Sequence, residues 1–127
     1  MIPTDTLLEA AKRLHGYLLK SAWDGQALSG PDSGVRFNAR VGRFVKSYLR
    51  AIPWSDRRIY MQAQGYWILD NWHLFELTGD ERYQELALAC SNYVLAAQRP
   101  EGYWEYPDPE WRNRIATVEG DFGCLGL

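Results

Sequence analysis

Residues 57–98 have the sequence RRIYMQAQGYWILDNWHLFELTGDERYQELALACSNYVLAAQ, and this stretch decides the fold. Its first half, Arg57 to Thr78, is apolar or aromatic nearly all round, which is typical of a helix buried on most sides. Between the halves, Gly79 suits the left-handed position that ends a helix, and Asp80 suits the cap of the next one. The second half, about Asp80 to Gln98, has the periodicity of an amphipathic helix. Its apolar positions are Tyr83, Leu86, Ala87, Cys90, Val94 and Ala97. The segment predicts an αα-hairpin with a buried inner helix and a half-exposed outer one.

The chain before this hairpin predicts two more helices, within residues 6–51. Thr6 and Glu9 have the spacing of a capping box, which places a helix start near Thr6. An apolar stripe follows, made of Leu7, Ala11, Leu14, Leu18 and Ala22. The glycines and proline of residues 24–34 indicate a connection. The second helix is expected from about Asn38 to Ala51, ahead of Pro53.

The chain after the hairpin repeats part of it. Residues 99–111 hold several prolines and form a loop, and a helix pattern restarts at Ile115 and continues to Leu127. Residues 58–67 (RIYMQAQGYW) resemble residues 113–122 (NRIATVEGDF) at an offset of 55, so that Gly65 matches Gly120 and Gln64 matches Glu119. That offset suits two helices and two connections, which favours a repeated helical hairpin.

The repeat predicts that residues 115–127 open a second hairpin whose outer helix is missing. The final turn carries no helix-end signal, and a single hairpin cannot bury its own apolar face without neighbours. We therefore expect residues 1–127 to be one truncated domain. The alternative is a small complete helical domain whose last helix docks on the rest.

Composition excludes several classes of function. The net charge is -2, and the densest basic stretch, Arg36 to Arg50, is interrupted by apolar residues at helical spacing. A nucleic-acid partner is therefore not expected, because phosphate recognition needs a concentrated basic surface. The chain has no run of about 20 apolar residues that could span a membrane and no secretion signal at its start, so a cytoplasmic protein is the default.

Cysteine and histidine usage predicts neither metal nor cofactor. The two cysteines, Cys90 and Cys124, both lie in apolar helical patterns and are expected to be reduced core residues. No spacing such as C-x-x-C indicates metal ligands. We expect no metal and no cofactor.

Residues 93–104, YVLAAQRPEGYW, carry a resemblance to known families. Gln98, Gly102 and Trp104 match the Q-x-x-x-G-x-W repeat of the terpenoid cyclase and prenyltransferase toroids. A similar order of helix, Gln, turn, Gly and Trp occurs in six-hairpin glycosidase-like toroids, and the turn LFELTGDERY at residues 74–83 looks more like that group. The resemblance implies an all-α fold of antiparallel αα-hairpin repeats, here the N-terminal part of an α/α toroid. It also implies a structural role for the motif, with the Gln98 amide binding free backbone groups at a neighbouring helix end and Trp104 packing over it.

This sequence differs from the motifs of these families, and the differences affect which function is expected. Ser91-Asn92 stands where the cyclase motif has its basic residue and glycine. The D-x-D-D and D-D-x-x-D motifs of the cyclases and synthases, and the zinc ligands of the prenyltransferases, are not found in this sequence. The leading expectation is therefore a fragment of a carbohydrate-active enzyme, a hydrolase, lyase or epimerase acting on a glycan or other small molecule. The alternatives are a terpenoid-cyclase-like toroid and a non-catalytic helical scaffold for binding.

Glu119 and Asp121 are the candidate catalytic residues. They flank Gly120 near the start of the last helix, where paired carboxylates at a toroid rim could share acid and base work on a sugar. The simpler interpretation is that acids in a first turn favour the positive end of the helix dipole. Side chains at i and i+2 also point well apart on a helix.

Five residues are candidates for substrate binding. Trp72 and His73 lie in the middle of the inner helix, and His73 could serve as a general base, although a histidine there is more often a hydrogen-bonded core residue. Tyr103, Tyr106 and Trp111 cluster with Trp104 in the proline-containing loop. Flat aromatic faces at a cavity rim suit stacking against sugar rings, lining an isoprenoid pocket, or packing on helix ends.

Overall fold

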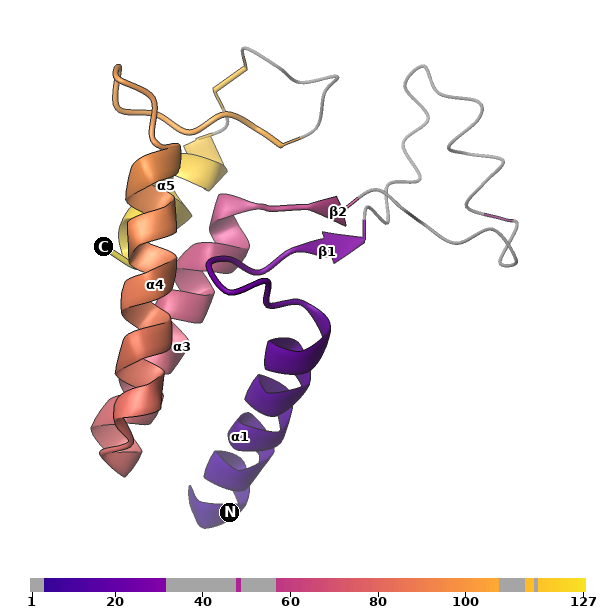
Figure 1. The fold of residues 1–127 in the computed structure, drawn as a ribbon, viewed down its shortest axis with the longest axis vertical. Coiled ribbons are helices and arrows are strands. Elements are labelled where there is room, and N and C mark those ends of the chain that lie inside the picture. The colour runs from indigo at the N-terminus through magenta and orange to yellow at the C-terminus, as the bar shows by residue number, and fades with distance from the viewer. Residues whose placement is uncertain (1–3, 32–47, 49–56, 108–113, 116) are drawn as a thin grey trace.

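The computed structural model describes residues 4–31, 48, 57–107, 114–115 and 117–127 (Figure 1). The described elements are α1 (Thr4–Ser21), β1 (Gly30–Pro31), β2 (Arg57–Arg58), α3 (Met61–Thr78), α4 (Glu81–Ala97) and α5 (Thr117–Leu125). The described chain is thus mostly helical, which confirms the all-α class. The helix expected between Asn38 and Ala51 lies, apart from Tyr48, outside the described residues.

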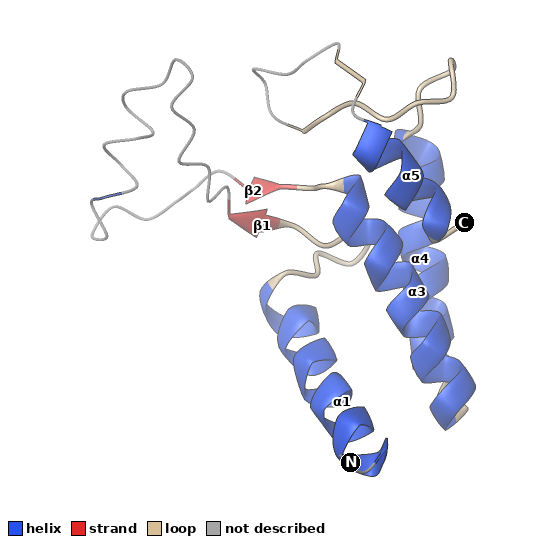
Figure 2. Ribbon diagram, turned by 180° about the vertical axis from the view of Figure 1, so that it is seen from behind, coloured by secondary structure: helices blue, strands red, loops and turns tan. Residues whose placement is uncertain are grey.

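Helix α3 is the centre of the fold. It packs against α4 along its length and crosses α5, while α1 stands on its other side (Figure 2). The core forms where these helices meet, around Trp67 and Ile68 of α3 and Cys90 and Val94 of α4. Trp104, from the loop after α4, closes this core at one end. Helix α3 has seven buried residues and α4 has three, so the third helix is the more buried of the two. It is not buried on most sides as predicted, because Tyr66 and Leu77 are exposed.

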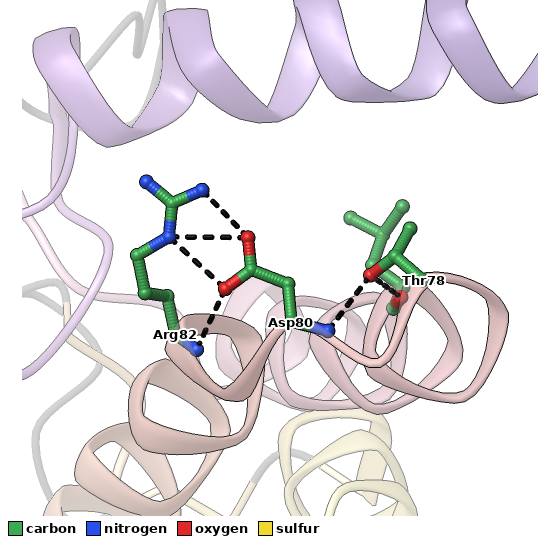
Figure 3. Close-up of polar contacts among 4 residues, drawn as sticks. Thr78, Asp80 and Arg82 are labelled. Atoms are coloured by element: carbon green, nitrogen blue, oxygen red, sulfur yellow. Dashed lines mark hydrogen bonds and ion pairs between the residues drawn. The ribbon is translucent and has the colours of Figure 1, made fainter.

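The turn between α3 and α4 has the predicted chemistry (Figure 3). Gly79 takes a left-handed conformation with φ of 70°, and its N–H donates to the Phe75 carbonyl at 2.7 Å. The Asp80 carboxylate caps α4 by accepting from the Arg82 backbone N–H at 3.1 Å. The Arg82 guanidinium also donates to Asp80, which lowers the pKa of that carboxyl to about 2.

The expected starts of three helices are wrong by two to four residues, and the cause in two cases is pairing with distant backbone. Helix α1 begins at Thr4, so the capping-box residue Thr6 lies inside it. Helix α3 begins at Met61 instead of Arg57, because Arg57–Arg58 pair antiparallel with Gly30–Pro31. Helix α5 begins at Thr117 instead of Ile115, because Ile115 forms a bridge with Glu105. A backbone used in such a ladder cannot also form helical hydrogen bonds.

Helices α3 and α5 approach closely at glycines. A Cβ placed on Gly65 would overlap the Phe122 carbonyl oxygen and lie 2.8 Å from its carbon, so only glycine fits at this crossing. A Cβ placed on Gly126, which directly follows α5, would lie 2.8 Å from the Ile68 side chain and 3.2 Å from the Gly65 Cα. Gly65 and Gly120 occupy matching positions in the sequence repeat. Their surroundings differ, because a Cβ placed on Gly120 would meet no atom within 4 Å.

The two cysteines differ in environment. Cys90 is fully buried in the core, as expected, and its burial raises the pKa of the thiol to about 12. Cys124 is exposed, so the expectation that it is a core residue is wrong. The short apolar pattern of α5 does not distinguish a buried face from an exposed one. No helix in the described part of the chain is long and apolar enough to cross a membrane.

Candidate functional site

A polar cleft of about 370 Å³ lies where β2, the end of α4 and the following loop meet. Three aromatic residues and four charged ones line it: Tyr93, Trp104, Tyr106, Arg57, Arg58, Arg99 and Glu105. Three arginines against one glutamate leave an excess of two positive charges at this place. The cleft is therefore electropositive in a chain whose net charge is -2.

The loop that forms one wall of the cleft is held by its own hydrogen bonds. The Gln98 side-chain amide donates to the Gly102 carbonyl at 2.9 Å, and the Gly102 N–H donates to the Arg99 carbonyl at 2.8 Å. Gly102 has φ of 95°, a conformation that favours glycine. The Trp104 indole N–H then donates to the Val94 carbonyl at 2.8 Å, one of the carbonyls left free at the end of α4. Gln98 thus binds its own turn rather than a neighbouring helix end.

The charged side chains of the cleft are fixed by partners around its rim. The Arg57 guanidinium donates to the Ser21 carbonyl and to both the carbonyl and the hydroxyl of Ser29, which ties β2 to the end of α1. Arg99 forms an ion pair with Glu105 at 2.8 Å, and this hydrogen bond raises the pKa of Arg99. Cations fixed in this way form a site whose geometry needs little reorganisation on binding.

Glu119 and Asp121 are not brought together. Glu119 is buried, and one oxygen of its carboxylate accepts from the backbone N–H groups of Met61 and Gln62, the latter at 3.3 Å. It therefore satisfies the free donors at the start of α3, the role of an N-terminal cap supplied from a distant helix. Burial raises the pKa of Glu119, and the two N–H groups oppose that effect. Asp121 is exposed on the other side of α5.

The predicted substrate-binding residues fall into separate places. Tyr106 lines the polar cleft and packs edge-on against Tyr60 at 5.8 Å between ring centroids. Tyr103 is half-buried in the same loop, where its carbonyl accepts from the Arg99 N–H. Trp72 is half-buried against Phe75 farther along α3, away from this cleft. Trp111 lies outside the described residues.

His73 belongs to a second cavity, an apolar groove of about 430 Å³ between α1 and α3. Its walls carry Leu7, Leu8, Leu14, Leu18, Leu74 and Leu77, and we call it the α1–α3 groove. Asp70 and His73 lie on the exposed side of α3, and His15 is buried beside Trp67. Partial burial raises the pKa of Asp70, although nearby His73 and His15 act in the opposite direction.

The contacts of His15 were not predicted. Its Nε2 lies 2.9 Å from the Asn71 side-chain oxygen, and its ring stacks on Trp67 with centroids 4.5 Å apart. The signal available in the sequence was a histidine next to the apolar stripe of the first helix. The partner could not be inferred, because Asn71 lies 56 residues away.

Within the described ranges, no group of three or more His, Cys, Asp and Glu side chains is placed to hold a metal ion. Comparison with models of known protein families, with curated proteins and with solved structures found no match for this chain.

Proposed function

We propose that this chain is part of a carbohydrate-active protein and that its polar cleft binds a glycan. The observation that carries the proposal is the pairing of aromatic faces with fixed charged groups in one cleft of about 370 Å³. Aromatic rings stack on the apolar faces of sugars, while guanidinium and carboxylate groups form directional hydrogen bonds with hydroxyl groups. The excess of two positive charges favours a glycan that carries carboxylate or sulfate groups.

The proposed chemistry is hydrolysis, elimination or epimerisation, each of which needs a group that transfers a proton. Glu105 lines the cleft, and Glu119 binds the backbone of Met61, another residue in its wall. Burial raises the pKa of Glu119, which is the direction that favours a general acid, so Glu119 is the first carboxyl group to test. Asp121 is the weaker candidate, because it is exposed and does not line the cleft.

We also propose that the helices belong to a repeated hairpin array of the α/α toroid type. The support comes from Gln64 and Glu119, which the 55-residue offset places at equivalent positions. Each is buried near the start of its helix, and each binds backbone of an earlier segment: Gln64 binds Leu28, and Glu119 binds Met61. A terpenoid-cyclase-like toroid is less well supported, because the cleft walls carry four charged side chains.

The test measures glycan binding by the 127-residue chain, using calorimetry for the affinity and the chemical shifts of backbone amides for the location. Trigalacturonate is the anionic probe and maltotriose is the neutral control. We expect trigalacturonate to bind and to shift the signals of the 99–107 loop. Tyr106→Ala should weaken binding about tenfold, the scale of one lost stacking contact and its buried area. Tyr17→Ala is the matched control, because Tyr17 is 66% exposed and lies outside both cavities.

Two results would contradict the proposal. In the first, Tyr17→Ala and Tyr106→Ala weaken trigalacturonate binding equally, which would mean that the effect is unrelated to the cleft. The other is the absence of binding by either sugar at millimolar concentration. Incubation of the chain with trigalacturonate, with detection of new reducing ends or of absorbing unsaturated products, separates an enzyme from a scaffold that only binds.

A further inference from the structure

The α1–α3 groove has an unusual distribution of polar groups, independent of the polar cleft. Its walls are leucine side chains contributed by both helices, with Trp67 at the floor. Among its described lining residues, Asp70 is the one that carries a formal charge at neutral pH, and no lysine or arginine lines it. Because Asp70 is exposed, its carboxylate is accessible to a ligand at the edge of this groove.

His15 joins α1 to α3 beside the groove. His15 stacks on Trp67 and meets Tyr83 edge-on at 5.0 Å, and its Nε2 pairs with Asn71. These contacts hold α1 and α3 at a set spacing at the middle of the groove. The leucines nearer the ends, by contrast, are accessible: Leu14 is 60% exposed and Leu77 is 68% exposed. A ligand can therefore enter without rearranging the buried part of the interface.

We propose that the α1–α3 groove binds a small amphiphilic amine, with its apolar body against the leucines and its ammonium group at the Asp70 carboxylate. A volume of about 430 Å³ lies in the range of small-molecule sites, roughly 300–1,000 Å³. The charge selects the head group: an ammonium ion pairs with Asp70, whereas a carboxylate ligand is repelled by it. The imidazole of His73, one turn along α3 from Asp70, provides a hydrogen-bonding group beside the same head.

The test uses three probes of matched shape: 4-phenylbutylamine, 4-phenylbutanol and 4-phenylbutyrate. Affinities are measured by calorimetry at about pH 8, where the amine is charged. We expect the amine to bind about tenfold more tightly than the alcohol, and the acid to bind more weakly than both. Amide chemical shifts should move along α1 and α3 and not in the 99–107 loop.

Two substitutions locate the binding. Asp70→Asn keeps the shape of the side chain and should reduce the affinity for the amine to that for the alcohol. Glu76→Gln is the matched control, because Glu76 is an exposed acid on the same helix outside the groove. Leu14→Ser should weaken all three probes together, and its 60% exposure keeps the substitution from disturbing the core.

The proposal is overturned if the acid binds as tightly as the amine, or if Asp70→Asn keeps the preference for the amine. It is also overturned if the chain forms a concentration-dependent dimer that Leu14→Ser abolishes, since a second copy would then cover the groove. A failure of glycan binding leaves these results unaffected, because the polar cleft shares no lining residue with the α1–α3 groove.

Discussion

Replacing Gly65 by alanine tests the α3–α5 crossing most directly. The new Cβ would overlap the Phe122 carbonyl oxygen and lie 2.8 Å from the carbonyl carbon. Both are backbone atoms of a helix, so no side-chain rotation can relieve the overlap, and α5 must move. That movement would also disturb the ring contact between Tyr66 and Phe122, whose centroids are 4.8 Å apart. Overpacking of this kind costs about 1–3 kcal/mol, and the rigid obstacle places this case at the upper end.

Alanine also gains about 1 kcal/mol over glycine inside a helix, which sets the net effect. We therefore expect Gly65→Ala to lower the free energy of unfolding by about 2 kcal/mol, equivalent to roughly 5–10 °C in Tm for a domain of this size. Gly16→Ala is the matched control, because Gly16 lies inside α1 with no atom within 4 Å of a hypothetical Cβ. At position 16 only the higher helix propensity of alanine matters, and it should stabilise the protein by about 0.5–1 kcal/mol.

The assay is urea and thermal unfolding followed by far-ultraviolet circular dichroism, with both variants measured beside the unmodified chain. The same substitution in two helices should therefore change the free energy of unfolding with opposite signs. If Gly65→Ala is as stable as the unmodified chain, or is stabilised like Gly16→Ala, then α5 does not pack on α3 as described. Loss of helical signal in Gly65→Ala before unfolding would locate the change in α5 itself.

Three other predictions follow from single contacts. Because burial raises the pKa of Glu119, its contribution to stability is complete below about pH 4.5 and is lost as the pH rises through the raised pKa. The unmodified chain should therefore lose stability relative to Glu119→Gln as the pH rises, which urea unfolding at several pH values measures. A stability difference that does not change with pH would contradict this prediction. Trp104→Phe leaves the buried Val94 carbonyl without its donor and should cost about 1–3 kcal/mol, measured by urea unfolding; no loss would mean that the indole bond contributes nothing. A thiol reagent at neutral pH should modify the exposed Cys124 at once and Cys90 only after unfolding, because Cys90 is buried with a pKa of about 12. Equal rates for both thiols would show that the core opens readily.

The elements that sequence predicts well are those decided by neighbouring residues. Gly79 and Asp80 end one helix and begin the next through contacts within four residues, so their roles could be inferred from the local pattern. The start of α3 could not, because Arg57 pairs with Pro31 across 26 residues of chain. A helical pattern is only a local preference, and a ladder formed with distant backbone overrides it.

The candidate site follows the same division. The aromatic loop was found because its residues are neighbours in sequence, and Tyr106 does line the polar cleft. Arg57 and Arg58 were not found, since they reach this loop only when β2 lies beside the end of α4. The α1–α3 groove was likewise hidden, although its leucine stripe was evident. Which charged side chain stands beside that stripe depends on how α3 is rotated, and no local pattern fixes this rotation.

Gln64 and Glu119 show why equivalent positions carry different side chains. Gln64 faces the peptide of Leu28, which offers both a donor and an acceptor: the side-chain oxygen accepts from the Leu28 N–H at 2.7 Å, and the side-chain nitrogen donates to the Leu28 carbonyl at 2.9 Å. A side-chain amide offers both a donor and an acceptor and so completes both bonds. Glu119 faces the start of α3, where the Met61 and Gln62 N–H groups are donors and no carbonyl points outward. A carboxylate, which only accepts, suits that end. The residue at each position is thus determined by the polarity of the backbone it meets, which is a property of the packing and not of the repeat.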